Sequence, residues 1–163
     1  MPIDFELSEG SLISQKHYHD IAEKQMRPYS RKYDIEEHTL PTEWVDYWWN
    51  EGRKGPQDPA INNNDGFVTI CLQAEELCWG DAGLYLRMPT PALGGSAVSS
   101  AGTKEQRHKF MSPFREEGGH PIWGAMAITE PQAGSDSAAI ETTADWDEET
   151  EEWVLNGIKI FCT

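Results

Sequence analysis

The chain has 163 residues, 38% of them hydrophobic and 10% aromatic, which is enough to bury a core and excludes a disordered tail. Its formal net charge of −15 argues against nucleic acid and anionic membrane surfaces as partners, because both require clustered lysines and arginines. An anionic cofactor would have to be held by local N–H groups and hydroxyls rather than by a positive field.

Helical spacing dominates the chain up to about residue 121. In the first helix, apolar residues recur at intervals of three and four, and Pro28 should kink or end that helix near Arg27. The recurring residues are Tyr18, Ile21, Ala22 and Met26. A second helix is predicted to begin near Pro41 and to end at Gly52. Its inward-facing residues are predicted to be Trp44, Val45 and Trp48.

A more apolar helix follows the loop at residues 53–65, which is rich in Gly, Pro, Asn and Asp. Its core-facing stripe is predicted to consist of Phe67, Cys71, Ala74 and Cys78. Gly80 should end this helix, and the two cysteines of the stripe are expected to be core residues rather than redox-active thiols. Pro89–Gly95 then interrupts the pattern, and Thr103–Gln106 has the form of a capping box that opens a short helix.

The periodicity then becomes strand-like. Trp123–Thr129 is predicted to be a short strand, and the turn-forming loop EPQAGSDS follows it. Glu141–Trp146 alternates, Trp153–Leu155 is apolar, and the acidic stretch between them is predicted to be a hairpin tip. Asn156–Gly157 is a hairpin-turn signal, so Ile158–Thr163 is predicted to be the return strand.

These patterns predict an α+β chain with an all-α N-terminal domain, residues 1–121, followed by the first antiparallel strands of a β-domain, residues 122–163. The last predicted strand has no terminal turn or cap, which is the pattern of a truncated chain. The sequence shows no signal peptide, no apolar run that could span a bilayer and no C-x-x-C pair among its three cysteines. We therefore expect a soluble, cytoplasmic protein without membrane insertion.

The loop Thr129–Asp136, with the sequence TEPQAGSD, has features that suit an anionic ligand. Pro131 fixes a turn, and Gly134 permits a left-handed backbone or a close approach. Ser135 adds a hydroxyl beside exposed amides, as in a phosphate-binding nest. Taken alone, the loop is a weak signal, and a plain surface turn is the better account of it.

The loop becomes specific when its neighbours are included. The strand AMAIT, the loop TEPQAGSD and the later segment NGIKIFCT together resemble the acyl-CoA dehydrogenase family. Weaker similarity covers MRPYSRKYD at 26–34, EELCWGDAGL at 75–84 and GTKEQRHKFMSPF at 102–114, so the resemblance extends over nearly the whole chain. It implies a β-barrel-like middle domain and an FAD-dependent α,β-dehydrogenation of an acyl-CoA thioester, with FAD as hydride acceptor.

The resemblance also implies roles for individual residues. The residues expected to contact the flavin are Met126, Ala127, Ile128, Thr129, Gly134, Ser135, Phe161, Cys162 and Thr163. In the family, the residue at Thr129 bonds the isoalloxazine ring, and the one at Ser135 lies near the pyrophosphate and the acyl-CoA, so Ser135 is also the expected substrate contact. Phe161 stands where the family often has tryptophan, which keeps an apolar ring but removes an indole donor. Thr163 matches the threonine whose hydroxyl reaches flavin N5, where a donor stabilises the reduced ring.

No residue of the chain matches the family's catalytic base, a glutamate of the C-terminal domain, so no catalytic residue is assigned and the chain alone is expected to be inactive. Glu130 is expected to stabilise its turn instead. The resemblance further implies an acyl-CoA substrate, an acceptor of the electron-transfer flavoprotein type and a homo-oligomeric full-length protein. Acyl chain length and branching have no diagnostic residues here.

Two alternatives to a dehydrogenase fragment remain: a non-catalytic truncated protein, and a binding module that uses some of the seven tryptophans for carbohydrate. Packing is a simpler account of four of these tryptophans, since they occupy predicted inward or strand positions. These are Trp44, Trp48, Trp123 and Trp153. His17 and His19 do not share a helical face, and the acidic hairpin tip lacks EF-hand spacing, so no metal site is predicted.

Overall fold

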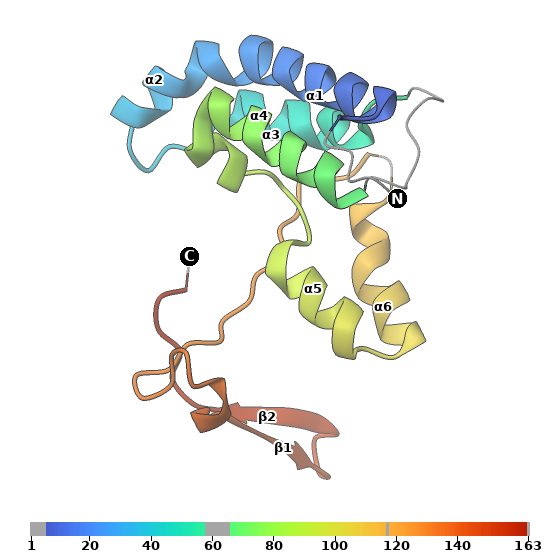
Figure 1. Ribbon diagram of the computed structural model, residues 1–163. Coiled ribbons are helices and arrows are strands. Elements are labelled where there is room, and N and C mark those ends of the chain that lie inside the picture. The colour runs from blue at the N-terminus through green and yellow to red at the C-terminus, as the bar shows by residue number, and fades with distance from the viewer. Residues whose placement is uncertain (1–5, 58–65, 117, 163) are drawn as a thin grey trace. The chain divides into compact units, whose positions relative to one another are not determined.

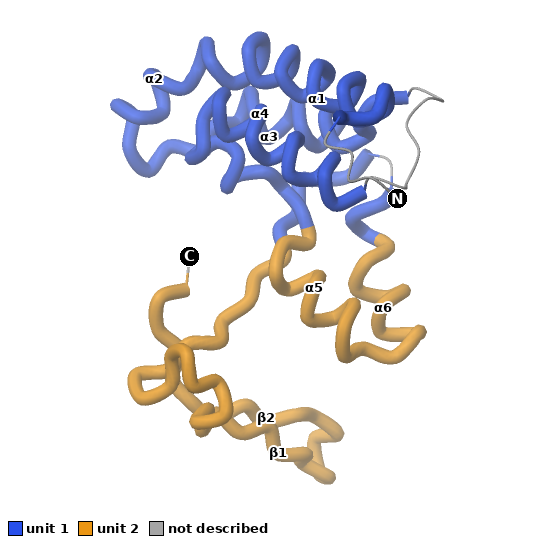
Figure 2. The backbone as a smooth tube through the Cα atoms, in the orientation of Figure 1, with its two compact units in different colours: residues 1–90, 113–123 blue, residues 91–112, 124–163 orange. Residues whose placement is uncertain are grey.

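The computed structural model of the chain describes residues 6–57, 66–116 and 118–162. Figure 1 labels the helices and strands, and Figure 2 colours the two compact units into which the chain divides. Unit 1 comprises Met1–Thr90 and Pro113–Trp123, and unit 2 comprises Pro91–Ser112 and Gly124–Thr163. The elements run from helices to an antiparallel strand pair, so the predicted α+β class is confirmed.

The first helical segment of unit 1 is interrupted immediately before its proline. Helix α1 spans Glu9–Ile21, a π-helical segment spans Ala22–Met26, and α2 spans Arg27–Ile35. Pro28 lies in the first turn of α2, directly after the π-helical segment, and the first turn is where a helix tolerates proline. The predicted break near Arg27 is thus confirmed, and all four residues of the predicted inward face are buried.

Helices α3, Thr42–Asn50, and α4, Gly66–Leu86, complete the core of unit 1. Trp44 is 0% exposed, and its indole Nε1 donates a hydrogen bond to the carbonyl oxygen of Leu84 at 2.7 Å. Trp48 lies beside it with 5.6 Å between ring centroids. The Nε1 of Trp48 is buried and has no hydrogen-bond partner among the described residues. The predicted inward face of α3 is confirmed.

Helix α4 buries a different stripe from the predicted one. Its buried residues are Leu77, Gly80 and Leu84. Phe67 is 89% exposed, and both Cys71 and Cys78 are exposed, so the prediction that these three face the core is wrong. The helix carries apolar residues on more than one face, and α1 packs against only one of them. The sequence predicts that this helix ends at Gly80. The structure has a break directly after it, at Asp81, whose φ of −173° and ψ of 118° are not helical.

Unit 2 contains one helix that the sequence pattern does not predict. Helix α5 spans Ala92–Ala101 and includes Gly94 and Gly95, two residues of the segment expected to break the pattern. Both glycines lie where a side chain would collide with neighbouring atoms: a Cβ at Gly95 would lie 2.4 Å from Cβ of Pro91. Close packing, and not a turn, therefore accounts for glycine at these positions.

Helix α6 spans Lys104–Met111 and has the capping box predicted for it. The backbone N–H of Gln106 donates to Oγ1 of Thr103 at 3.2 Å, and the backbone N–H of Thr103 donates to Oε1 of Gln106 at 2.8 Å. These two bonds satisfy amides that a helix start would otherwise leave open. Short 3-10 turns span Gly52–Lys54, Ser112–Phe114 and Ser137–Ala139.

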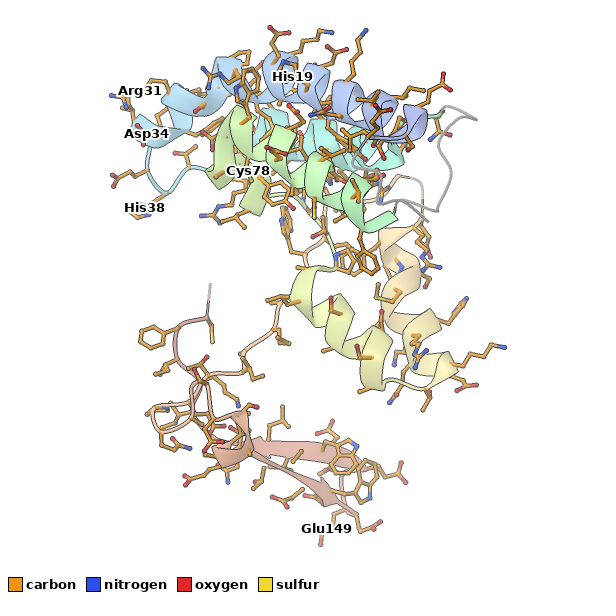
Figure 3. All side chains as sticks on the ribbon, viewed as in Figure 1. His19, Arg31, Asp34, His38, Cys78 and Glu149 are labelled. Carbon is orange, nitrogen blue, oxygen red and sulfur yellow. The ribbon has the colours of Figure 1, made fainter. Side chains whose placement is uncertain are left out.

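Strands β1, Thr143–Asp147, and β2, Glu152–Asn156, form a two-stranded antiparallel hairpin. Trp146 pairs with Trp153 across it, and their ring centroids lie 5.5 Å apart in an edge-to-face arrangement. Figure 3 shows Glu149 at the hairpin tip. The hairpin tip lies at the acidic stretch, as predicted. Strand β1 spans Thr143–Asp147, where the sequence predicts Glu141–Trp146.

The other two predicted strands are wrong. Residues 123–129 have no strand partner among the described residues, where β1 and β2 pair with each other. One main-chain bond from the described residues reaches this segment: the amide of Ile160 donates to the carbonyl oxygen of Thr129 at 2.9 Å. Asn156–Gly157 is not the hairpin turn, since Asn156 is the last residue of β2 and pairs with Thr143. The described part of Ile158–Thr163 returns to residues 128–130 and does not fold back on β2.

The tryptophans divide into two groups. Packing in the core is confirmed for Trp44 and Trp48. It is wrong for Trp123, which is 45% exposed, and for Trp153, which lies in β2 but is 64% exposed because the hairpin leaves its residues largely open to solvent. In the parts of the chain that the structure describes, no helix has the length and apolar character needed to cross a membrane.

Candidate functional site

The chain after Gly124 is an extended segment that lies directly on the start of α5. A Cβ at Gly124 would lie 2.1 Å from the carbonyl oxygen of Pro91, and one at Gly94 would lie 2.5 Å from the carbonyl oxygen of Ala125. Only glycine permits both approaches. This backbone contact within unit 2 fixes the position from which residues 126–129 continue.

The next four residues present both apolar side chains and open backbone groups. Met126 is 40% exposed and Ile128 is 46% exposed, while Ala127 is exposed and Thr129 is half-buried. In an extended chain alternate side chains point to the same side, so Met126 and Ile128 share one side of the segment. Among the described residues, none is hydrogen-bonded to the backbone of Met126 or Ala127. The segment can therefore pair with a ligand edge.

A tight turn follows at residues 130–133. The amide of Glu130 donates to the carbonyl oxygen of Ala133 at 2.9 Å, and the amide of Ala133 donates to the carbonyl oxygen of Glu130 at 3.1 Å. Gly134 and Ser135 come directly after this turn and are exposed, with nothing within 4 Å of the position that a Cβ of Gly134 would occupy. The loop thus offers an accessible hydroxyl and backbone.

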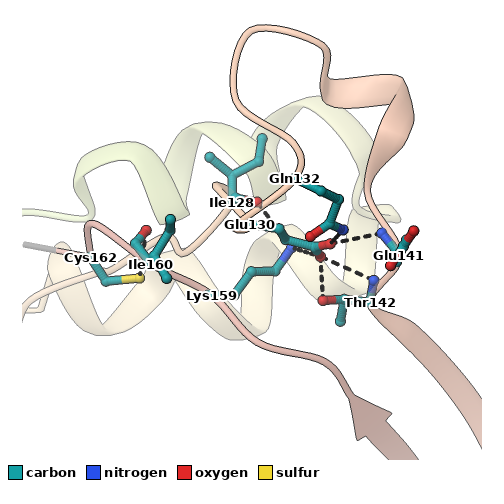
Figure 4. A network of polar contacts seen from close by, with 8 residues as sticks. All are labelled: Ile128, Glu130, Gln132, Glu141, Thr142, Lys159, Ile160 and Cys162. Atoms are coloured by element: carbon teal, nitrogen blue, oxygen red, sulfur yellow. Dashed lines mark hydrogen bonds and ion pairs between the residues drawn. The ribbon is translucent and has the colours of Figure 1, made fainter.

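Glu130 is the polar centre of this region, as Figure 4 shows. Its side chain is 3% exposed and lies 2.7 Å from Nζ of Lys159. Its carboxylate also accepts hydrogen bonds from the amide of Glu141 at 2.8 Å, from the amide of Thr142 at 3.0 Å and from Nε2 of Gln132 at 2.7 Å, besides a short one from the Thr142 hydroxyl. The turn-stabilising role expected for Glu130 agrees with these contacts.

The bond from Lys159, followed by that from the Thr142 hydroxyl, lowers the pKa of Glu130 well below its usual value. Glu130 therefore remains a carboxylate at neutral pH, and all its partners are donors. A carboxylate with so low a pKa is a weak base, and its oxygens are already occupied by donors. Its contacts assign it to structure rather than to proton transfer.

The end of the described chain returns to the same place. Lys159 Nζ donates to the carbonyl oxygen of Ile128 at 3.0 Å, next to the Ile160–Thr129 main-chain bond. Phe161 follows with its ring 89% exposed and a positive φ of 55°, and Cys162 is exposed. Thr163, the expected N5 contact, lies outside the described residues. The structure therefore brings the two expected flavin-contacting stretches, 126–129 and 161–162, to one locality.

These residues fit the ring of a flavin. An isoalloxazine has apolar faces and a hydrogen-bonding edge, and the site supplies exposed apolar side chains at Met126, Ile128 and Phe161 beside unpaired backbone groups. The open backbone and hydroxyl at Gly134–Ser135 suit a pyrophosphate without any cationic side chain. Within the described residues, no group of three or more His, Cys, Asp or Glu side chains could hold a metal ion.

Two family models match the chain. The acyl-CoA dehydrogenase N-terminal domain matches residues 9–117, and the acyl-CoA dehydrogenase middle domain matches residues 125–163. The chain belongs to the acyl-CoA dehydrogenase family. The resemblance carried by TEPQAGSD and NGIKIFCT is therefore confirmed.

Individual members of the acyl-CoA dehydrogenase family are similar over nearly the whole chain. Acryloyl-CoA reductase (NADH) of Anaerotignum propionicum is 32% identical over 98% of this chain and 40% of its own length. The short-chain specific acyl-CoA dehydrogenase of Clostridium acetobutylicum is 32% identical over 99% of this chain and 42% of its own length. Butyryl-CoA dehydrogenase of Megasphaera elsdenii shares the fold with a TM-score of 0.72 and 26% identity, covering 98% of this chain and 42% of the solved one. The chain thus spans about 40% of the length of these relatives.

Sequence reasoning missed the residues that join the site together. Lys159 and Thr142 are far from Glu130 in sequence, and neither was singled out. The sequence offers one signal: the motif TEPQAGSD contains a glutamate, and the motif NGIKIFCT contains a lysine, in a chain whose net charge is strongly negative. Such a pair suggests a contact, but only the fold shows which acidic residue the lysine meets.

Proposed function

We propose that this chain supplies part of the FAD-contacting surface of an enzyme that removes hydrogen from Cα and Cβ of an acyl-CoA thioester. The observation that carries the proposal is the convergence of 126–129 and 160–162, two stretches from the two specific family motifs, through the Ile160–Thr129 bond. When bound, FAD supplies the hydride acceptor for such a reaction. The relatives named as acyl-CoA dehydrogenases support the same reaction class.

The chain's own residues have distinct proposed roles. Met126 and Ile128 contact one face of the ring, and their neighbours Ala127 and Thr129 bond its polar edge through the backbone and the Thr129 hydroxyl. Gly134 and Ser135 face the pyrophosphate, and Ser135 also contacts the acyl-CoA. Phe161, Cys162 and Thr163 complete the contact with the ring, with Thr163 donating to N5. No residue of this chain is proposed as the base.

We further propose that the functional boundary between the helical and β parts lies between residues 121 and 122. The interval between the two family matches, which end at 117 and begin at 125, supports this position. An acceptor of the electron-transfer flavoprotein type and a homo-oligomeric enzyme are proposed as partners of the full-length protein, by family alone.

A second candidate, the reverse reduction of an enoyl-CoA, is favoured by one observation. The identity to acryloyl-CoA reductase (NADH) is 32%, the same as that to the short-chain specific dehydrogenase. Both candidates need the same flavin contacts, so they differ in the direction of electron flow and not in the site described above.

Flavin contact can be tested by titrating the 15N-labelled chain with FAD and following amide chemical shifts. We expect weak, saturable shifts at 126–129, 134–135 and 161–162, because these residues carry the proposed flavin contacts. The amides of Glu149 at the hairpin tip and of His108 in α6 should not move, and they serve as internal controls. Shifts spread over the whole chain, or none at millimolar FAD, would contradict the proposed contacts.

A further inference from the structure

We propose that Glu130 and Lys159 are positioning residues that hold the two flavin-contacting stretches of the proposed site, 126–129 and 160–162, in register. Neither side chain is proposed to touch the flavin. The clamp itself rests on geometry, and only what the two stretches bind rests on the proposed function.

Lys159 makes one contact with the first stretch and one with the residue directly after it. Its Nζ lies 2.7 Å from Oε1 of Glu130 and donates to the carbonyl oxygen of Ile128 at 3.0 Å. The Lys159 side chain is 23% exposed and that of Glu130 is 3% exposed, so the pair is largely shielded from solvent. Charge-assisted bonds in such surroundings are stronger than those between surface groups.

The carboxylate of Glu130 holds a third part of the chain. It accepts from the amides of Glu141 and Thr142, directly before β1. One side chain therefore joins the turn at 130–133, the start of the hairpin and the segment around Lys159 (Figure 4). Without it, the amides of Glu141 and Thr142 would lose their acceptor in a partly buried place.

The pair lies beside the backbone bond that, within the described residues, links the two stretches. That bond, from Ile160 to the carbonyl oxygen of Thr129, is flanked by Ile128 and Glu130 on one side and by Lys159 on the other. A single main-chain bond in an open region forms a weak link, since neither stretch belongs to a sheet. The clamp therefore determines how long the two stretches stay together.

Other ion pairs in the described part of the chain do not share this arrangement. Lys54 and Glu51, for example, lie 3.1 Å apart with side chains 51% and 63% exposed, one helical turn from each other. Exposed pairs of this kind contribute little. They provide a matched control, because the same chemical change can be made in both pairs.

The test compares Lys159→Met, Glu130→Gln and their double variant with Lys54→Met and Glu51→Gln in the full 163-residue chain. The first readout is hydrogen exchange of the Ile160 amide, which needs no flavin. We expect exchange about tenfold faster in each clamp variant, corresponding to about 1.4 kcal/mol, and a double variant no faster than the worse single one. The control variants should exchange as the parent does.

A nuclear Overhauser contact between the indoles of Trp146 and Trp153, 5.5 Å apart between centroids, shows whether the hairpin remains folded. If Lys159→Met or Glu130→Gln unfolds the hairpin, Thr142→Val tests the clamp in its place. It deletes one hydroxyl donor to the Glu130 carboxylate and leaves both charges in place, so it should raise Ile160 exchange by a smaller factor, about threefold. Ile160 exchange within twofold of the parent in the folded variants overturns the proposal.

The second readout is the FAD titration. Weaker FAD binding in Lys159→Met than in Lys54→Met, with faster Ile160 exchange, supports the clamp as a determinant of cofactor retention. Faster exchange in the clamp variants, together with a parent chain that shows no FAD contact, would retain the clamp and reject the proposed function. Unchanged exchange with intact FAD binding would reject the clamp and retain the function.

Discussion

Trp44→Ala is expected to lower the free energy of unfolding of the helical unit by about 3–5 kcal/mol, the usual cost of deleting a buried aromatic ring. Trp44 is 0% exposed, packs against Trp48 and Tyr47, and bonds the Leu84 carbonyl oxygen. A loss of this size is comparable to the whole stability of many small domains. Urea unfolding followed by helical circular dichroism should show a midpoint shift large enough to leave part of the chain unfolded in buffer.

A pair of phenylalanine variants separates the hydrogen bond from the ring. Trp44→Phe and Trp48→Phe remove similar volume from one helix face. Of these two indoles, only that of Trp44 has a partner for its N–H among the described residues. Leu84 retains the amide of Arg87 as a donor, so its carbonyl would not be left unbonded. Trp44→Phe should therefore cost more than Trp48→Phe by about 1 kcal/mol. Equal costs would show that the Trp44 bond contributes nothing.

Gly80→Ala is the second large effect, and its sign is the informative part. Alanine normally stabilises a helix interior by about 0.5–1 kcal/mol relative to glycine. At Gly80, however, the new Cβ would lie 2.8 Å from Cβ of Ala22 and 3.1 Å from its Cα, where α4 crosses the π-helical segment. We expect a destabilisation of about 1–3 kcal/mol from this overpacking.

Gly66→Ala is the matched control for that substitution. Gly66 begins the same helix, and the position of its Cβ has nothing within 4 Å. Its effect should be neutral or slightly stabilising when both variants are measured by the same urea unfolding. If Gly80→Ala were also neutral, the close approach of α4 to Ala22 would not describe the protein in solution.

Helical features that depend on neighbouring residues could be predicted from the sequence. The buried face around Tyr18 and Met26, the break before Pro28 and the Thr103 capping box are all set within a few residues, and the structure confirms them. The choice of a buried face on α4 could not be predicted in this way. Several faces are apolar, and α1 decides between them by packing against the stripe that contains Leu77.

Two of the strand predictions failed for a related reason, while the hairpin strands β1 and β2 lie close to where the sequence predicts them. A strand needs a partner, and apolar content at 123–129 or at Ile158–Thr163 does not identify one. Glycines were also ambiguous, because at Gly94 and Gly124 they permit backbones to touch and do not mark turns. The Glu130–Lys159 contact was hidden because its members are separated by the whole hairpin. Motif resemblance indicated which residues form the proposed site, while the contacts among them required the fold.

The most direct test of the proposed function is a chimera in which this chain replaces the matching segment of the short-chain specific acyl-CoA dehydrogenase of Clostridium acetobutylicum, of which it covers 42%. We expect the chimera to bind FAD and to oxidise a short-chain acyl-CoA with an artificial electron acceptor, and Lys159→Met to weaken its retention of FAD. The 163-residue chain alone should show no turnover, because no residue in it matches the family's base. A folded chimera that retains FAD but turns over acyl-CoA in neither direction, beside an active parent enzyme, would contradict the account.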